Sequence, residues 1–276
     1  MTTTPDAASP PDPAPAMQRA RGTVRAAFKR RGEATVIDRL YQGGSARLRL
    51  PRTTGAEAVL LNTAGGVTGG DRFETTITAA PRTALTVTTQ TAERLYRSTG
   101  AEGRIDNALI LGQGARVDWL PQETILFEGA RLRRTLRVDM AGDATLLAVE
   151  PLVLGRTAMG ERVTRGALHD AWRVRRGGAL VYADALRFGG DIAGMLGAQA
   201  TLDGCIACVA LLYVAPDASD RLEALRGTLD KNCAASAWNG LLAARILSDT
   251  GAGLRKALER AVATLRTGPL PRVWSI

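Results

Sequence analysis

The fold is indicated first by a glycine-rich loop that lies between two apolar runs. The segment reads Val59-Leu60-Leu61-Asn62-Thr63-Ala64-Gly65-Gly66-Val67-Thr68-Gly69-Gly70-Asp71-Arg72-Phe73-Glu74. Glycine accepts positive φ angles and close backbone approach without a steric clash, so the two glycine pairs specify an unusual backbone path. The loop is either a tight connection between strands, with a bulge, or a device that presents Asp71 and Glu74 at a functional site.

The loop does not match a nucleotide-binding loop. A phosphate-binding loop ends in Gly-Lys-Ser/Thr, whereas Asp71 follows the second glycine pair here and would repel a phosphate. A dinucleotide fingerprint leads into a helix. The residues from Phe73 to Thr78 are instead rich in β-branched side chains and alternate as a strand does. Nucleotide binding at this loop is therefore not expected.

Strand patterns continue on both sides of this loop. Apolar and polar residues alternate in Arg47-Leu48-Arg49-Leu50 and over 83–88, and strand-length runs recur from 24–30 to 206–214. Glycines separate many of these runs, and no helical pattern alternates with them. We therefore expect a mainly β fold, built from stacked antiparallel or β-helical sheets rather than from strand–helix–strand units.

The residues after the last of these runs change to a helical period. Leucines spaced for one face predict a helix over 219–229, and a second helix is predicted over 238–247. Thr250 can cap a third helix over 254–266, whose apolar residues form a stripe.

These patterns divide the chain into a tail and one domain. Residues 1–20 form a Pro- and Ala-rich segment that we expect to be disordered. The domain then covers 21–276. Its β-rich part is predicted over 21–215, its small helical part over 218–267, and an extended, proline-stiffened tail over 268–276.

Cysteine usage and apolar runs indicate the compartment. Only three cysteines occur, an odd and low count that argues against a disulfide framework. Cys205 and Cys208 form a C-x-x-C pair, but residues three apart on a strand point to opposite faces, so we interpret both as buried hydrophobic residues. The first residues lack the pattern of a secretory signal, and the longest apolar run, 205–215, is too short to span a bilayer. We therefore expect a cytoplasmic protein without a membrane partner.

The chain is strongly basic, with 36 Lys and Arg residues against 27 Asp and Glu residues. Nearly all of the basic residues are arginine, which suits protein interfaces as well as nucleic acids. Few aromatic residues are available to stack on single strands, and no recognition helix stands out. Arg131, Arg133, Arg134 and Arg137 form the candidate basic patch, which we interpret as a solvated strand face. No nucleic-acid partner is expected, but a basic all-β nucleic-acid-binding module remains an alternative.

No catalytic constellation is visible in the sequence. His169 is the only histidine, which excludes a zinc site built from several imidazoles, and no serine lies in a G-x-S-x-G elbow. Acids beside turns or strand ends are the remaining candidates; they are Asp71, Glu74, Glu123, Glu128, Glu150 and Glu161. Paired carboxylates support glycoside hydrolysis, so a carboxylate-dependent hydrolase is a second alternative. The low content of aromatic residues and histidine favours a binding or assembly protein over an enzyme.

Five segments in order resemble the urease accessory protein family UreD, also called UreH. The match begins with Leu60-Leu61-Asn62 and Gly65-Gly66-Val67-Thr68-Gly69-Gly70-Asp71, and continues with Thr89-Gln90-Thr91-Ala92-Glu93-Arg94-Leu95-Tyr96-Arg97-Ser98, Trp119-Leu120-Pro121-Gln122-Glu123-Thr124-Ile125-Leu126-Phe127-Glu128-Gly129-Ala130, Gly155-Arg156-Thr157-Ala158-Met159-Gly160-Glu161 and Leu270-Pro271-Arg272-Val273-Trp274. One such segment is a weak signal, but five in register are hard to obtain by chance. The resemblance covers about residues 22–276.

The resemblance implies a function in nickel delivery. Members of this family are not enzymes but cytosolic scaffolds, which join UreF and the GTPase UreG and dock on apo-urease so that nickel reaches its active site. The family's acids for an internal nickel passage correspond to Asp71 and Glu74 here, with Glu128 and Glu161 as weaker candidates in their own matched segments. No stably bound cofactor is implied, only transient Ni²⁺.

The residue inventory fits such a passage. Ni²⁺ is held more tightly by imidazole and thiolate than by carboxylate, so a carboxylate-lined route releases the ion readily. A wet channel also spares a hydrated ion the penalty of full desolvation. We therefore expect Asp71 and Glu74 to attract nickel inside a wet tunnel; the alternative is that Asp71 only caps the glycine loop.

Overall fold

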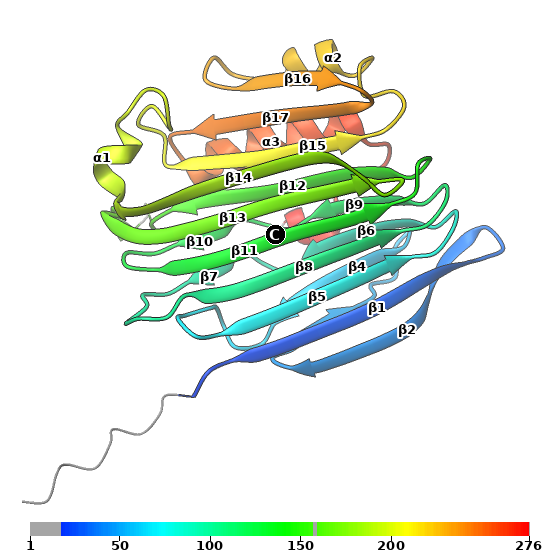
Figure 1. The fold of residues 1–276 in the computed structure, drawn as a ribbon, viewed down its shortest axis with the longest axis horizontal. Coiled ribbons are helices and arrows are strands. Elements are labelled where there is room, and N and C mark those ends of the chain that lie inside the picture. Colours follow the sequence, from blue (N-terminus) through cyan, green and yellow to red (C-terminus); the bar gives the residue numbers. More distant parts are fainter. Residues whose placement is uncertain (1–17, 157–158, 276) are drawn as a thin grey trace, which may run out of the picture.

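The fold is seen in a computed structural model that describes residues 18–156 and 159–275. Most of the predicted tail 1–20 lies outside these described residues. The main chain forms two stacked sheets with one long helix packed against the second sheet (Figure 1). The prediction of a mainly β fold is confirmed.

The first sheet, here called the outer sheet, has seven strands within the described residues. In spatial order they are β14 (Ala179–Asp191), β13 (Arg165–Arg176), β11 (Arg131–Met140), β8 (Gly103–Leu111), β5 (Arg72–Ala79), β1 (Arg21–Arg31) and β2 (Ala34–Gly44). In Figure 1 this sheet lies in front.

The second sheet, here called the middle sheet, lies between the outer sheet and the long helix. Its strands in spatial order are β16 (Ala234–Trp238), β17 (Leu241–Ser248), β15 (Ala207–Val214), β12 (Thr145–Leu154), β9 (Arg116–Leu120), β6 (Ala84–Thr89), β4 (Glu57–Asn62) and β3 (Ala46–Arg49). Two short strands lie off this order: β10 (Thr124–Leu126) pairs with β12 and with β7 (Glu93–Leu95).

The inner strands of the outer sheet pair in parallel, and so do β4, β6, β9 and β12 of the middle sheet. The chain crosses from one sheet to the other at almost every turn, so that β4, β6, β9 and β12 join the middle sheet while β5, β8, β11 and β13 join the outer sheet. Parallel neighbours need a crossover connection, and here a strand of the opposite sheet supplies it in place of a helix. The β-helical prediction is therefore confirmed. Antiparallel pairing is also present, at β1–β2 and β13–β14 of the outer sheet, at β3–β4 of the middle sheet, and throughout the part of the middle sheet formed by β12, β15, β17 and β16.

Two apolar layers hold these elements together. Inward side chains of both sheets form the larger layer, which includes Phe28, Leu109 and Trp172. The smaller layer lies between the middle sheet and the helix α3 (Gly251–Leu265), which buries Leu254, Leu258 and the other residues of its stripe. The middle sheet is thus covered on both faces, and every residue of β15 is buried.

The predicted helical part is correct only in its last and first portions. The side chain of Thr250 accepts a hydrogen bond from the Gly253 amide at 3.0 Å, so the predicted cap and the third helix are confirmed. The helix expected over 219–229 is limited to α2 (Leu222–Arg226), and a further short helix, α1 (Ile192–Leu196), was not expected.

The helix predicted over 238–247 is wrong, because this segment forms the hairpin of β16 and β17. Asn239 and Gly240 adopt φ angles of 48° and 74° at its turn. Asn-Gly is the typical sequence of a tight hairpin turn, since both of its central residues need positive φ. The β-rich part therefore extends beyond the predicted limit at residue 215.

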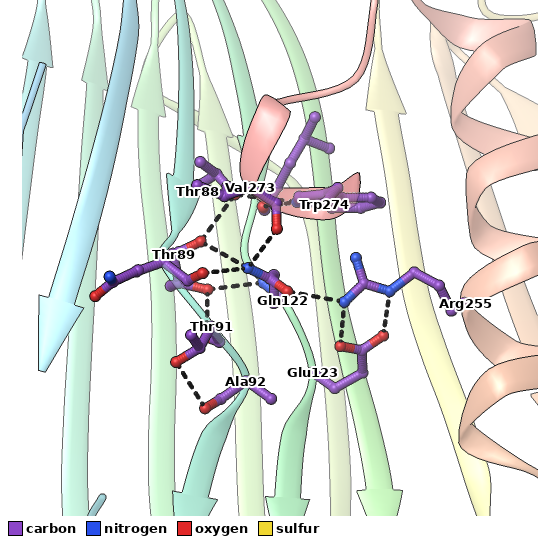
Figure 2. Close-up of polar contacts among 11 residues, drawn as sticks. Thr88, Thr89, Thr91, Ala92, Gln122, Glu123, Arg255, Val273 and Trp274 are labelled. Carbon is purple, nitrogen blue, oxygen red and sulfur yellow. Dashed lines mark hydrogen bonds and ion pairs between the residues drawn. The ribbon is translucent and has the colours of Figure 1, made fainter. Parts of the chain in front are cut away.

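The C-terminal segment packs on the middle sheet instead of remaining extended. Residues Arg272–Ser275 form a 3₁₀ turn, η2, which corrects the extended tail predicted over 268–276. The indole nitrogen of Trp274 donates to Thr88 Oγ1 at 3.1 Å and to the Leu120 carbonyl at 3.3 Å (Figure 2). The Arg255 guanidinium lies 4.8 Å from the centre of the ring.

Trp274 is predicted to anchor the C-terminal segment to β6 and β9 of the middle sheet. The ring is buried and its N–H group has hydrogen-bond acceptors. We therefore expect Trp274→Ala to lower the free energy of unfolding by about 3–5 kcal/mol in urea denaturation. Trp238→Ala is the matched control and should lose clearly less, since Trp238 is 39% exposed. Equal losses in the two variants would contradict the anchoring role.

Candidate functional site

A cavity of about 180 Å³ lies between the two sheets beside the glycine-rich loop. Its lining passes from exposed residues such as Gly65, Thr91 and Arg94 to the buried Arg134 and Glu150. Amides, hydroxyls, the further arginine Arg47 and apolar side chains such as Leu60 and Phe73 make up much of the rest, and no histidine or cysteine of the described residues takes part. Because a water molecule occupies about 30 Å³ of liquid, the cavity has room for several. A concave site with converging polar groups is the natural candidate for function.

The glycine-rich loop forms the rim of this cavity. Val67 bridges to Leu95 and its amide donates to the Arg94 carbonyl at 2.8 Å, which pins the loop to β7. A Cβ on Gly66 would lie 2.4 Å from the Tyr96 ring, and one on Gly69 would lie 2.0 Å from Ser98 Oγ. The unusual backbone path expected from the sequence is therefore confirmed, and close approach is the reason for it.

Asp71 caps this loop. The residue is 4% exposed, and its carboxylate accepts hydrogen bonds from the Ala20 amide at 2.7 Å and the Thr68 amide at 2.9 Å. Glu74 lies on β5 with its side chain exposed on the outer face of the outer sheet, beside Thr23 and Asp106 of the neighbouring strands. Strand alternation separates the two acids, since the chain turns Phe73 inward and Glu74 outward.

Glu128 and Glu161 lie together at the strand ends near β13. Glu128 accepts hydrogen bonds from the amide and hydroxyl of Thr164, at 2.6 and 2.8 Å, and its own amide donates to Glu161. Burial alone would raise the pKa of Glu128, but these hydrogen bonds bring it below its usual value. The hydrogen bond from Arg156, at 2.9 Å, lowers the pKa of Glu161. Both carboxylates are thus ionised and held by partners of the chain itself.

None of these four acids lines the cavity. The structure brings Glu128 and Glu161 together, but it places Asp71 inside the loop and Glu74 on the outer surface. Neither Asp71 nor Glu74 thus lines this cavity, and their expected role in a nickel passage stays a prediction. The cap predicted as the alternative for Asp71 is present.

A buried ion cluster forms the deep end of the cavity. Arg134 contacts Glu150 at 2.5 Å, Asp170 at 2.6 Å and the Thr124 hydroxyl at 2.8 Å. Trp119 adds a hydrogen bond to Glu150 at 3.1 Å. Burial raises the pKa of Glu150, although the charge of Arg134 acts against this shift. The cluster therefore contains two carboxyl groups and one guanidinium. Protonation of Glu150 brings the net charge of the cluster to zero.

A second acid with a raised pKa lies near the rim. Burial raises the pKa of Glu93 to about 7, although hydrogen bonds from Asn62 favour its ionised form. The Asn62 amide reaches both carboxylate oxygens, at 3.2 and 3.3 Å, and also the Gly66 carbonyl at 3.0 Å. Asn62 therefore ties Glu93 to the glycine-rich loop.

The cavity wall is also tied to the long helix (Figure 2). Gln122 lines the cavity and donates to the Gln90 carbonyl at 2.7 Å, while its side-chain oxygen accepts from Arg255 of α3 at 3.0 Å. Arg255 also forms an ion pair with Glu123 at 2.5 Å. These contacts fix the wall from the face opposite to the cavity.

Sequence reasoning missed Glu93 and Arg134 as site residues, and it placed Glu150 only among acids near turns. A usable signal was present for two of them. Glu150 is the only charged residue in the apolar strand Thr145–Leu154, and Arg134 occupies an inward position in the alternation of β11. Glu93 gave no signal beyond its place in a matched segment.

Comparison with known proteins identifies the family of this fold. The family model described as UreD urease accessory protein matches residues 20–275. The chain belongs to the UreD family. It is 48% identical to the urease accessory protein UreD of Chelativorans sp. (strain BNC1), with 96% of each chain covered. It is 47% identical to UreD of Xanthobacter autotrophicus, with 94% of this chain and 91% of that protein covered.

Membership of the UreD family gives the chain a role in urease maturation, with urease-related partners. Within residues 18–156 and 159–275, no three His, Cys, Asp or Glu side chains form a group that could hold a metal ion. Cys205 and Cys208 are buried as free thiols. No helix among the described residues is long and apolar enough to cross a membrane.

Arg134 is predicted to be essential for stability. Arg134→Met leaves two buried carboxylates without a counter-charge, so we expect the free energy of unfolding to fall by about 3–5 kcal/mol at pH 7.5 in urea denaturation. The triple variant Arg134→Met/Glu150→Gln/Asp170→Asn removes all three charges and should recover part of this loss. A loss that is the same in both variants would show that packing, and not charge, is responsible.

Glu93 is predicted to make stability depend on pH. In the folded chain it loses its proton near pH 7, whereas its ordinary pKa is 4.5. Between these values the folded chain binds more protons, so this carboxyl makes the free energy of unfolding fall as the pH rises. We expect Glu93→Gln to flatten the decline between pH 5 and 7.5 by roughly 1–3 kcal/mol. The exposed Glu33→Gln serves as the control, and identical profiles for the two variants would contradict the assignment.

Proposed function

We propose that the chain is a cytoplasmic accessory scaffold that acts with UreF and UreG and passes Ni²⁺ toward the active site of apo-urease. The observation that supports this function is the cavity between the sheets, which has one acid near its rim, Glu93, and another at its deep end, Glu150. Nickel is here a cargo and not a resident cofactor. The chain performs no catalytic step in this proposal.

The chemistry of the lining suits transfer more than storage. Ni²⁺ binds imidazole and thiolate more strongly than oxygen ligands, so the carboxylates, amides and hydroxyls of this lining let the ion leave, and its three arginines, Arg47, Arg94 and Arg134, oppose retention of a cation. Water in the cavity keeps part of the hydration shell and avoids the large penalty of stripping the ion. The two raised pKa values add a condition, since Glu93 and Glu150 attract a cation only once they have lost their protons.

The four acids first expected to form the passage have other tasks in this proposal. Asp71 holds the glycine-rich loop at the cavity rim, and Glu128 and Glu161 fasten the strand ends near β13. Glu74 lies on the outer surface. Nickel transfer is thus assigned to Glu93 and Glu150, with Asp71 acting through the position of the loop.

The test compares two sets of variants in a reconstituted activation assay with UreF, UreG, apo-urease and Ni²⁺. We expect Glu93→Gln to assemble normally and to lower both the nickel content and the activity of urease several-fold, because the substitution removes the charge but keeps the shape. Asp71→Ala/Glu74→Ala should act mainly through loop order, which lower stability would reveal. Glu33→Gln, an exposed acid elsewhere, is the control. Full activation by Glu93→Gln would reject the route, and normal urease activation without this chain would reject the function.

A further inference from the structure

A row of basic side chains crosses the outer face of the outer sheet. The pairing register places one such residue opposite another on six successive strands, from β1 to β14; they are Arg21, Arg72, Arg104, Arg133, His169 and Arg187. We call this set the basic row. Every member is exposed or half-exposed, because the residues next to them in the strands, such as Phe73, Leu132 and Leu168, are buried in the core. Arg134 of the predicted patch points inward and does not belong to it.

The basic row is unfavourable for the isolated fold. Like charges directly opposite each other on neighbouring strands destabilise a sheet. Glu102 offsets only part of this charge, with Arg133 at 2.6 Å and Arg104 at 3.8 Å. Among the described residues, Arg21, Arg72 and Arg187 form no ion pair. The fold therefore keeps positive charge on Arg21, Arg72 and Arg187 that no ion pair within the described part of the chain offsets.

The form of the basic row indicates the chemistry of a partner. Arginine offers carboxylates two parallel hydrogen bonds. Strands spaced by about 4.8 Å place an arginine at five of the six positions of the row, with His169 at the other. A hollow beside the basic row is lined by Glu102, Arg131, His169 and Arg187, among others. A side chain of a partner can bind in this hollow.

The next row along the strands argues against a nucleic acid. There Glu74 stands beside Asp106, and Thr23 and Thr135 flank them, so acids replace the bases within one strand repeat of about 7 Å. A phosphate backbone, which carries only negative charge, meets repulsion at this row. A protein segment with acids on one line and neutral or basic residues beside it does not.

We propose that the basic row docks an acidic helix of a protein partner, which lies across the strands. A helix presents residues of one face once per turn of about 5.4 Å, close to the strand spacing of about 4.8 Å, whereas an extended strand repeats one face only every 6.6–6.8 Å or so. Five strand spacings cover about 24 Å, which corresponds to between four and five helical turns. The flexible arginine side chains absorb the remaining mismatch.

The test uses the purified chain alone and a labelled synthetic helix with glutamates on one face as the probe. We expect the chain to bind this peptide in fluorescence anisotropy, with affinity that falls as salt is added. Arg21→Gln/Arg72→Gln/Arg104→Gln should weaken binding about tenfold, as expected for the loss of three exposed ion pairs. The same variant should be at least as stable as the parent, since like charges have been removed.

A control variant separates this surface from net charge. Lys231→Gln/Lys256→Gln/Arg260→Gln removes the same charge at exposed sites away from the outer sheet and should retain parental affinity. An equal loss in both variants would overturn the proposal. So would equally tight binding of a peptide with its glutamates distributed around the helix, or of a short DNA duplex. Because no nickel or urease is involved, the result does not depend on the proposed function.

Discussion

Parallel backbone pairing between strands that the chain visits alternately is the constraint on which this structure depends. From β4 to β13 the long strands alternate between the two sheets, so that neighbours such as β5 and β8 run in the same direction and in register. Inward side chains then stack on inward side chains from strand to strand, and outward ones stack on outward ones. The register that builds the apolar core therefore also aligns the arginines of the basic row and the polar lining of the cavity.

The buried charges are consistent with this layered arrangement. Arg134, Glu150 and Asp170 come from three strands, two in the outer sheet and one in the middle sheet, and they meet where the cavity ends. Ions in such a place need partners, because desolvation without them is strongly unfavourable. The cluster thus links the sheets across the core, and it places a titratable group, Glu150, at the cavity.

Local patterns predicted much of the fold and little of the site. Alternation along the strands, the Thr250 cap and the Asp71 turn depend on near neighbours, and the structure contains all three. The direction of strand pairing depends on segments far apart in the sequence, so alternation could not distinguish parallel from antiparallel sheets. A short apolar segment such as Leu241–Ser248 fits a helix or a strand, and the Asn239-Gly240 turn was the signal that decided it. Whether an acid faces the cavity depends on which sheet covers it, which explains why Glu93 was missed and why the outward position of Glu74 was not foreseen.

The burial of β12 and β15 on both faces has a consequence for biosynthesis. These two adjacent strands are apolar along almost their whole length, and Leu146 pairs with Val214 from a distant part of the chain. Until the outer sheet and α3 have both docked, β12 and β15 expose a broad apolar surface that is prone to association. Pairings between segments that are distant in the sequence also form slowly. The yield of folded protein thus depends on the competition between two rates, docking of the three layers and association of partly folded chains through the exposed middle sheet. Rapid synthesis at high concentration favours the second.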